Sequence, residues 1–169
     1  MVQEVVIEAY NSAWIEEFES EKKKISQVLA NNVHQIEHIG STSIVGMPAK
    51  PILDIAVSVN SLDEADLFIE PLKTLGYEYV PKLDFPNRRF FRKGARKKGT
   101  HHLHVYEQSS DEWSHNLLFR NYLRSHPEQA AAYAELKKHL ASLYVEDRAT
   151  YTQMKAPFIQ SIIDLAKKE

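Results

Sequence analysis

The stretch that decides the fold reads as two strands joined by a turn and a loop. It begins Glu37-His38-Ile39-Gly40-Ser41-Thr42-Ser43 and continues through Lys50-Pro51 into Ile52-Leu53-Asp54-Ile55-Ala56-Val57. Gly40 allows the backbone to turn tightly or to approach a ligand closely. The three residues that follow it, Ser41, Thr42 and Ser43, offer hydroxyl groups. If a helical turn starts there, they also offer free backbone N–H groups that can hold an anion.

Asp54 is the exception in the apolar run 52–59. A carboxylate in such a run is costly to bury unless it is paired or bound to a metal ion. In a strand, Asp54 shares one face with Ile52, Ala56 and Ser58. It either bonds to the backbone or to Lys50, or it binds a metal. The Gly-Ser turn upstream favours the metal, because a phosphate cradle beside a metal-binding carboxylate is a common way to hold nucleotides.

Three of the eight histidines lie within the short segment 100–105. Strand alternation places His102 and His104 on one face, and His101 with Leu103 on the other. Two imidazoles about 7 Å apart along a strand can bind a divalent ion together with a third ligand. Hydrogen-bonded structural histidines, acid–base catalysis and substrate binding are the alternatives.

The segment 88–98 holds seven basic residues and no acidic one. Basic density with interleaved aromatic side chains allows binding of phosphate, nucleotide or RNA. Arg89 and Arg92 are the expected ligand contacts, and the alternative is a solvated loop.

Asn116 and Arg120 lie one helical turn apart and could close over a ligand, although most of that stretch reads as core. Lys155 could play the same role.

The remaining pattern predicts an α/β (α+β) protein with a small mixed sheet. A helix is expected from Asn11 or Ser12 to Leu29, and a second one runs from a cap at Asn60 or Ser61 to Gly76. Residues 4–8 read as a short edge strand and 77–80 as another strand. Strands at 89–92 and 100–107 form a hairpin around the loop 93–99. Three helices follow, over 111–125, from Pro127, and over 147–168. We therefore expect a core over 1–108 and a C-terminal helical extension over 109–169, packed as one compact unit.

Composition narrows the chemistry and the location. The chain has 169 residues, a net charge of −2 and no cysteine. Metal ligands must then be histidines and carboxylates. The N-terminus lacks the features of a signal peptide, and no apolar run approaches the roughly 20 residues of a membrane span. A cytoplasmic protein without membrane contact is expected.

With these residues in view, the chain resembles the GrpB family along nearly its whole length. The resemblance rests on Trp14 with Phe18, His38-Ile39-Gly40-Ser41-Thr42-Ser43, Ala49-Lys50-Pro51-Ile52-Leu53-Asp54, Arg88-Arg89-Phe90-Phe91-Arg92, Thr100-His101-His102-Leu103-His104-Val105, Leu117-Leu118-Phe119-Arg120, Tyr133-Ala134-Glu135-Leu136-Lys137 and Tyr151-Thr152-Gln153-Met154-Lys155. That family is similar to the polymerase-β-like nucleotidyltransferases.

The resemblance implies a triphosphate held at Gly40 and Ser41, and a metal ion bound by Asp54. In active members of that superfamily a second carboxylate stands two residues further along the strand, where this chain has Ala56. The strand expected to carry the third carboxylate has His102 and His104, which suit Zn²⁺ or Mn²⁺ better than Mg²⁺.

Three functions follow as expectations. The first is nucleotidyl transfer from a nucleoside triphosphate to an unknown acceptor, using Mg²⁺ or Mn²⁺, or Zn²⁺. Lys50 and the Ser41–Ser43 hydroxyls would bind substrate, and Asp54, His102 and His104 would act in catalysis and metal binding. The second is a nucleotide- or metal-binding module without transfer chemistry. The third is a metal-dependent phosphohydrolase.

Overall fold

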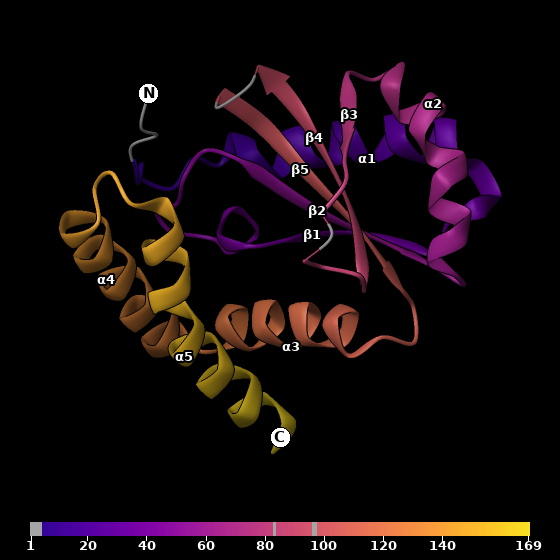
Figure 1. Ribbon diagram of the computed structural model, residues 1–169. Helices are drawn as coiled ribbons and strands as arrows, with labels where there is room; N and C mark the ends of the chain where they lie inside the picture. The colour runs from indigo at the N-terminus through magenta and orange to yellow at the C-terminus, as the bar shows by residue number, and fades with distance from the viewer. Residues whose placement is uncertain (1–4, 83, 96–97) are drawn as a thin grey trace.

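The computed structural model describes residues 5–82, 84–95 and 98–169 (Figure 1). These residues form one five-stranded sheet with the order β1-β2-β5-β4-β3. The strands are β1 (Gln35–Ile39), β2 (Leu53–Val59), β3 (Tyr77–Val80), β4 (Arg88–Ala95) and β5 (Lys98–Glu107). Only β2 and β5 run parallel, while the other neighbours are antiparallel. The sheet is therefore mixed, as the sequence predicts.

One face of the sheet carries the main apolar core. Alternate residues of the parallel strands β2 and β5, such as Ile55, Val57, Leu103 and Val105, point to this face and are fully buried. The helix α1 (Ala13–Leu29) covers it with Phe18, Ile25 and Leu29, and α2 (Ile69–Lys73) adds Leu72. The period of two along each strand thus sends every second residue into this core.

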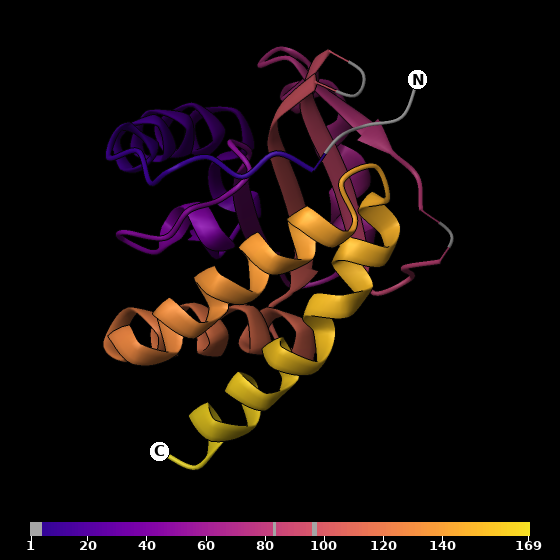
Figure 2. The same cartoon turned by 90° about the vertical axis from the view of Figure 1, so that its left-hand side faces the viewer.

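The first of three C-terminal helices packs on the opposite face (Figure 2). The helix α3 (Asp111–Ser125) packs Trp113 and Leu117 on Ile39, Ala56 and Tyr106. Beyond it lie α4 (Pro127–Leu143) and α5 (Arg148–Lys167), which contact each other and α3. Their starts follow local rules, because Ser110 and Asp147 accept hydrogen bonds from the backbone N–H of Trp113 and Thr150, and Pro127 occupies the first turn.

Two predicted elements differ from the structure. The helix expected after Ser61 is a 3-10 helix over Leu62–Phe68 followed by the short α2. Pro71 lacks the N–H that would bond the carbonyl of Leu67, which disfavours one continuous α-helix over 62–73 but suits the first turn of α2. The edge strand expected over 4–8 is reduced to a single bridge between Glu8 and Ala49, and residue 4 lies outside the described part.

The hairpin is longer than predicted, because β4 and β5 extend into the loop expected at 93–99. Arg96 and Lys97 lie outside the described residues. The strand β5 ends at Glu107 and α3 begins at Asp111, on either side of the boundary expected at residue 108. Within the described part of the chain, no helix has the length and hydropathy to cross a membrane.

Candidate functional site

The predicted Asp54–His102–His104 cluster comes together at the centre of the sheet. In the parallel pair, Asp54 lies opposite His102 and Ala56 lies opposite His104, so the three polar side chains share a face. The Asp54 Oδ1 atom is 3.4 Å from His104 Nε2 and 3.7 Å from His102 Nδ1. One donor atom from each residue lies within 4.8 Å of the other two. This spacing suits a shared cation.

The charge states of the cluster also suit a metal ion. Burial lowers the pKa of His102 to about 4, which leaves its imidazole neutral near pH 7. Burial acts to raise the pKa of Asp54, but the hydrogen bond to His104 and the charges around it outweigh burial and lower that pKa. An ionised carboxylate with a neutral imidazole offers lone pairs to a cation. A set of two histidines and one carboxylate favours Zn²⁺, Mn²⁺ or Fe²⁺ over Mg²⁺.

The Gly40 turn packs directly against this cluster. Gly40 has a φ of +73°, and a Cβ placed on it would lie 2.6 Å from Asp54 Oδ2. The residues Ser41–Ser43 then form one 3-10 turn. The Thr42 hydroxyl lies 2.9 Å from His38 Nε2, and the Ser43 hydroxyl donates to the Gly40 carbonyl. Glycine is therefore required here by both the backbone conformation and the space.

A cavity of about 100 Å³ opens beside Asp54 and His102. Ser41 and Thr42 form part of its wall, and four cationic side chains complete it: Lys50, Lys137, Arg148 and Lys155. These cations come from the loop before β2, from α4 and from α5. We call this space the phosphate cavity.

The cations of the phosphate cavity crowd one another. Burial, followed by the charges of Lys155 and Lys50, lowers the pKa of Lys137 to about 7. Burial, followed by Lys155 and Arg148, lowers the pKa of Lys50 to about 8. Two of these ammonium groups lie near the ring of Tyr151, whose centroid is 5.2 Å from Lys50 Nζ and 4.7 Å from Lys155 Nζ. An anion would relieve this repulsion.

Some predicted site residues gather here. Gly40, Ser41, Thr42, Lys50, Asp54, His102, His104 and Lys155 all lie in or next to the cluster and the phosphate cavity.

Other predicted residues lie elsewhere. Arg89 sits on the opposite face of the sheet from His102 and donates to the carbonyl of Pro86. Arg92 pairs with His102 in the sheet register, but its guanidinium lies 3.6 Å from Glu78. Asn116 donates to the carbonyl of Glu112 within α3. Arg120 pairs with Glu37 at 2.8 Å, and it lines a different cavity together with Ser43.

Sequence reasoning missed Lys137, Arg148 and Tyr151. Lys137 has a visible signal, because it stands between Tyr133 and Leu140 on the buried stripe of α4. A lysine on such a stripe is almost never fully buried without a partner. Its Nζ donates to the carbonyl of Pro48. Arg148 and Tyr151 carry no comparable signal, because they reach the cavity only through the packing of α5.

Ala56 occupies the position where the resemblance implies a second carboxylate, and the structure leaves no open space there. Ala56 is fully buried and packs in one apolar cluster with Ile39, Tyr106 and Trp113. The helix α3 thus covers the space that a longer side chain at position 56 would need.

Known proteins support the fold and the family. A family model described as GrpB protein matches residues 4–165. The UPF0157 protein YqkA of Bacillus subtilis (strain 168) is 40% identical over 166 residues, covering 98% of this chain and 48% of that protein. The chain therefore spans about half the length of that relative. The crystal structure of the conserved protein GrpB from Enterococcus faecalis matches with a TM-score of 0.88 at 40% identity, over 96% of this chain and 98% of that one.

A more distant likeness shows the fold alone. The structure of Cid1 in complex with the UTP analog UMPNPP matches with a TM-score of 0.55 at 14% identity, over 80% of this chain and 43% of that one. Structural neighbours of this kind have the nucleotidyltransferase fold, and the described sheet with its flanking helices has it as well.

Proposed function

The chain belongs to the GrpB family, and we propose that it binds a nucleotide or another phosphorylated ligand at a single divalent metal ion held by Asp54, His102 and His104. The observation that carries the proposal is that Asp54 and His102 of this cluster border one small cavity together with four cationic side chains. Phosphate groups are the ligands that combine with both features, because they bind metal ions and ammonium groups alike.

The balance of charge argues for an anionic ligand. Among the described residues, four lysine or arginine side chains and one carboxylate line the phosphate cavity. The lowered pKa values of Lys50 and Lys137 indicate that burial and mutual repulsion act against their charged forms. A bound phosphate would favour those charged forms and would also occupy the turn at Ser41, where hydroxyl and backbone N–H groups are available.

The residues present fit one metal ion. Asp54, His102 and His104 would hold it, with Zn²⁺ or Mn²⁺ preferred over Mg²⁺ because two of the three ligands are imidazoles. When bound, such an ion polarises a phosphoryl oxygen and lowers the pKa of a bound water molecule. The protein's own groups would orient the ligand, with Lys50, Lys155 and Arg148 neutralising its charge.

Nucleotidyl transfer is the second candidate, and the fold that the chain shares with Cid1 favours it. The closed position at Ala56 opposes it, because transfer by two metal ions needs a second carboxylate at that place. Binding without transfer, and hydrolysis of a phosphoester, both remain compatible with one metal ion. RNA binding along the basic segment 88–98 stays a prediction.

Calorimetric titration tests the proposal. The purified protein is titrated with Zn²⁺, Mn²⁺ and Mg²⁺, and then with ATP, GTP and pyrophosphate in the presence of the best metal. We expect one metal per chain, loss of metal binding in Asp54→Asn and in the double variant His102→Ala with His104→Ala, and no change in His139→Ala. His139 is an exposed histidine on α4 and serves as the matched control.

The anion half of the proposal has its own control. Lys155→Met and Lys137→Met should weaken pyrophosphate binding, whereas Lys138→Met, a change at the exposed neighbouring lysine, should not. Release of pyrophosphate together with a nucleotidyl group joined to an acceptor would assign transfer. Release of inorganic phosphate, or of pyrophosphate with the free mononucleotide, would assign hydrolysis. Absence of metal binding, together with equal anion affinity in all lysine variants, would refute the proposal.

A further inference from the structure

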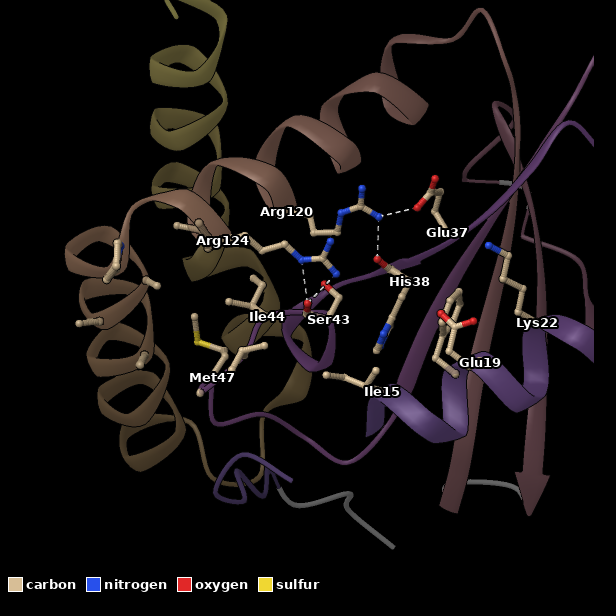
Figure 3. A pocket seen from close by; sticks show the side chains of 18 residues that line it. Ile15, Glu19, Lys22, Glu37, His38, Ser43, Ile44, Met47, Arg120 and Arg124 are labelled. Carbon is tan, nitrogen blue, oxygen red and sulfur yellow. Dashed lines mark hydrogen bonds and ion pairs between the residues drawn. The ribbon is translucent and has the colours of Figure 1, made fainter. Parts of the chain in front are cut away.

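A second and larger cavity lies on the other side of the turn that borders the phosphate cavity. Its volume is about 630 Å³, within the range of small-molecule sites. Its walls come from α1, β1, α3, α4 and the segment Ser43–Met47. In the described part of the chain the two cavities share no lining residue, because Ser41 and Thr42 face the first and Ser43–Met47 face the second. Figure 3 shows this second cavity, which we call the α3–α4 cavity.

Much of the α3–α4 cavity is apolar. Ile15 and Val45 contribute large side chains that are 44% and 73% exposed, so apolar surface faces water at this place. Three small residues of α4, Ala130, Ala131 and Ala134, leave the room that longer side chains would fill. Such exposed apolar surface rimmed by polar residues is typical of a binding site.

The polar side of the α3–α4 cavity has a surplus of positive charge. Arg120 and Arg124 extend from one side of α3 toward Glu37, His38 and Ser43 (Figure 3). Arg120 is neutralised by Glu37 and also donates to the His38 carbonyl at 3.0 Å. Arg124 donates through Nε and Nη2 to the Ser43 carbonyl, at 3.0 and 2.8 Å.

Arg124 is not matched by a carboxylate. No acidic group among the described residues lies within 4.0 Å of its guanidinium, and its Nη1 atom has no protein acceptor there. Glu19 and Lys22 of α1 also line the cavity and offset one another in charge. One guanidinium group is therefore available to an anionic group beside an apolar wall.

We propose that the α3–α4 cavity binds a small amphipathic organic anion, a molecule with an apolar body and one acidic group. Its acidic group would bind Arg124, and its apolar body would lie along Ile15, Val45 and the alanines of α4. The chemistry differs from that of the phosphate cavity, which is about 100 Å³ and lined by four cations. The proposal does not rest on the proposed function.

A pair of fluorescent probes tests the two halves of this ligand. Anilinonaphthalene sulfonate has an aromatic body with one acidic group, and phenylnaphthylamine has nearly the same body without it. We expect saturable binding of the sulfonate at one site per chain. Binding should persist in the presence of pyrophosphate and in Lys155→Met, which separates this site from the phosphate cavity.

Two neighbouring alanines give the matched variants. Ala131 and Ala132 are both exposed on α4, but only Ala131 lines the α3–α4 cavity. Ala131→Phe should fill part of the cavity and weaken both probes about tenfold, whereas Ala132→Phe should leave both affinities unchanged. Arg124→Met should weaken only the sulfonate, by about tenfold, and Arg124→Lys should restore part of that loss. Near-UV circular dichroism of each variant reports whether it is folded.

Three outcomes would overturn the proposal. One is the absence of saturable sulfonate binding by the wild-type chain. Another is equal probe affinity in Ala131→Phe and Ala132→Phe. The third is an equal effect of Arg124→Met on both probes, which would leave the acidic group without a role.

Discussion

The strands β2 and β5 have two faces that differ in character, since one is apolar and buried and the other carries the partly exposed polar cluster. On one face, Ile55 and Leu103 are fully buried in the main apolar core. On the other, Asp54 and His102 leave roughly a quarter to a third of their side-chain surface exposed, at 31% and 24%. Neighbouring residues in the chain are thus separated by the thickness of the sheet.

This difference shows how the fold can hold a costly polar cluster. The apolar face supplies the stability, because burial of large side chains is the main favourable term in folding. The polar face contributes side chains whose burial is opposed by desolvation. Changes on the first face should therefore affect stability, and changes on the second should affect ligand binding.

The largest effect is expected from a change on the apolar face. Leu103→Ala removes a fully buried side chain and should lower the free energy of unfolding by about 3 kcal/mol. His102→Ala, one residue away, should change it by less than about 1 kcal/mol while abolishing metal binding. Urea denaturation and metal titration of both variants measure the contrast. Similar losses of stability in the two would remove the distinction between the faces.

The next effect concerns the point where the two faces are most alike, because Ala56 lies on the face of Asp54 but is fully buried in an apolar cluster. Ala56→Asp places a carboxylate under Trp113 and should lower the free energy of unfolding by about 3 kcal/mol, without gain of pyrophosphate release. Ala56→Asn introduces a side chain of similar size without a charge. Its stability therefore shows how much of the loss in Ala56→Asp comes from crowding and how much from the buried charge. A stable Ala56→Asp variant that releases pyrophosphate from a triphosphate would contradict this expectation.

A smaller effect is expected at the glycine that contacts the polar face. In Gly40→Ala the new methyl group would sit on a backbone with positive φ and would clash with the Asp54 carboxylate. The substitution should lower the free energy of unfolding by about 2 kcal/mol and should weaken metal binding. Gly46→Ala is the control, because Gly46 has a φ of +83° but open space around its missing Cβ. In that variant the free energy of unfolding should fall only by the cost of holding alanine at a positive φ. Unchanged metal affinity in Gly40→Ala would show that Asp54 can shift without loss.

The smallest effect is a pH dependence of anion binding. Lys137 and Lys50 have pKa values near 7 and 8 in the free protein, so each loses its charge as the pH rises through these values. Anion affinity should therefore be highest below pH 7 and should fall between pH 7 and 9, by about fivefold to tenfold.

Sulfate is the suitable probe, because its charge stays constant over this range. In Lys137→Met the fall should be smaller and should occur near pH 8, where Lys50 still titrates. Lys138→Met should behave like the wild type. A flat profile in the wild-type chain would contradict the lowered pKa values.

The sequence predicted the sheet and the gathering of Asp54, His102 and His104 for a simple reason. Both rest on the period of two along a strand, which places His102 with His104 and isolates Asp54 in an apolar run. The starts of α3 and α4 were also predictable from nearby residues, because Ser110 caps one helix and Pro127 stands in the first turn of the other. The α3–α4 cavity had no such signal, because it depends on how α1, α3 and α4 meet.

The gathering of four cations around the phosphate cavity could not be predicted from local sequence patterns. Lys137 reaches the carbonyl of Pro48 across 89 positions of the chain. Contacts of this kind follow from the angles at which α4 and α5 pack against α3 and against each other, and a helical pattern does not specify those angles. Arg92 pairs with Glu78 for a related reason, since β3 lies at the edge of the sheet beside β4.

The cover of α3 over Ala56 also bears on how such a site could change by evolution. A carboxylate at position 56 is useful only if the indole of Trp113 first makes way for it. The two changes then depend on each other, and the substitution that opens the space must precede the one that fills it with charge. Directed evolution toward two-metal chemistry should therefore start from libraries at Trp113 and Tyr106, before position 56 itself is varied.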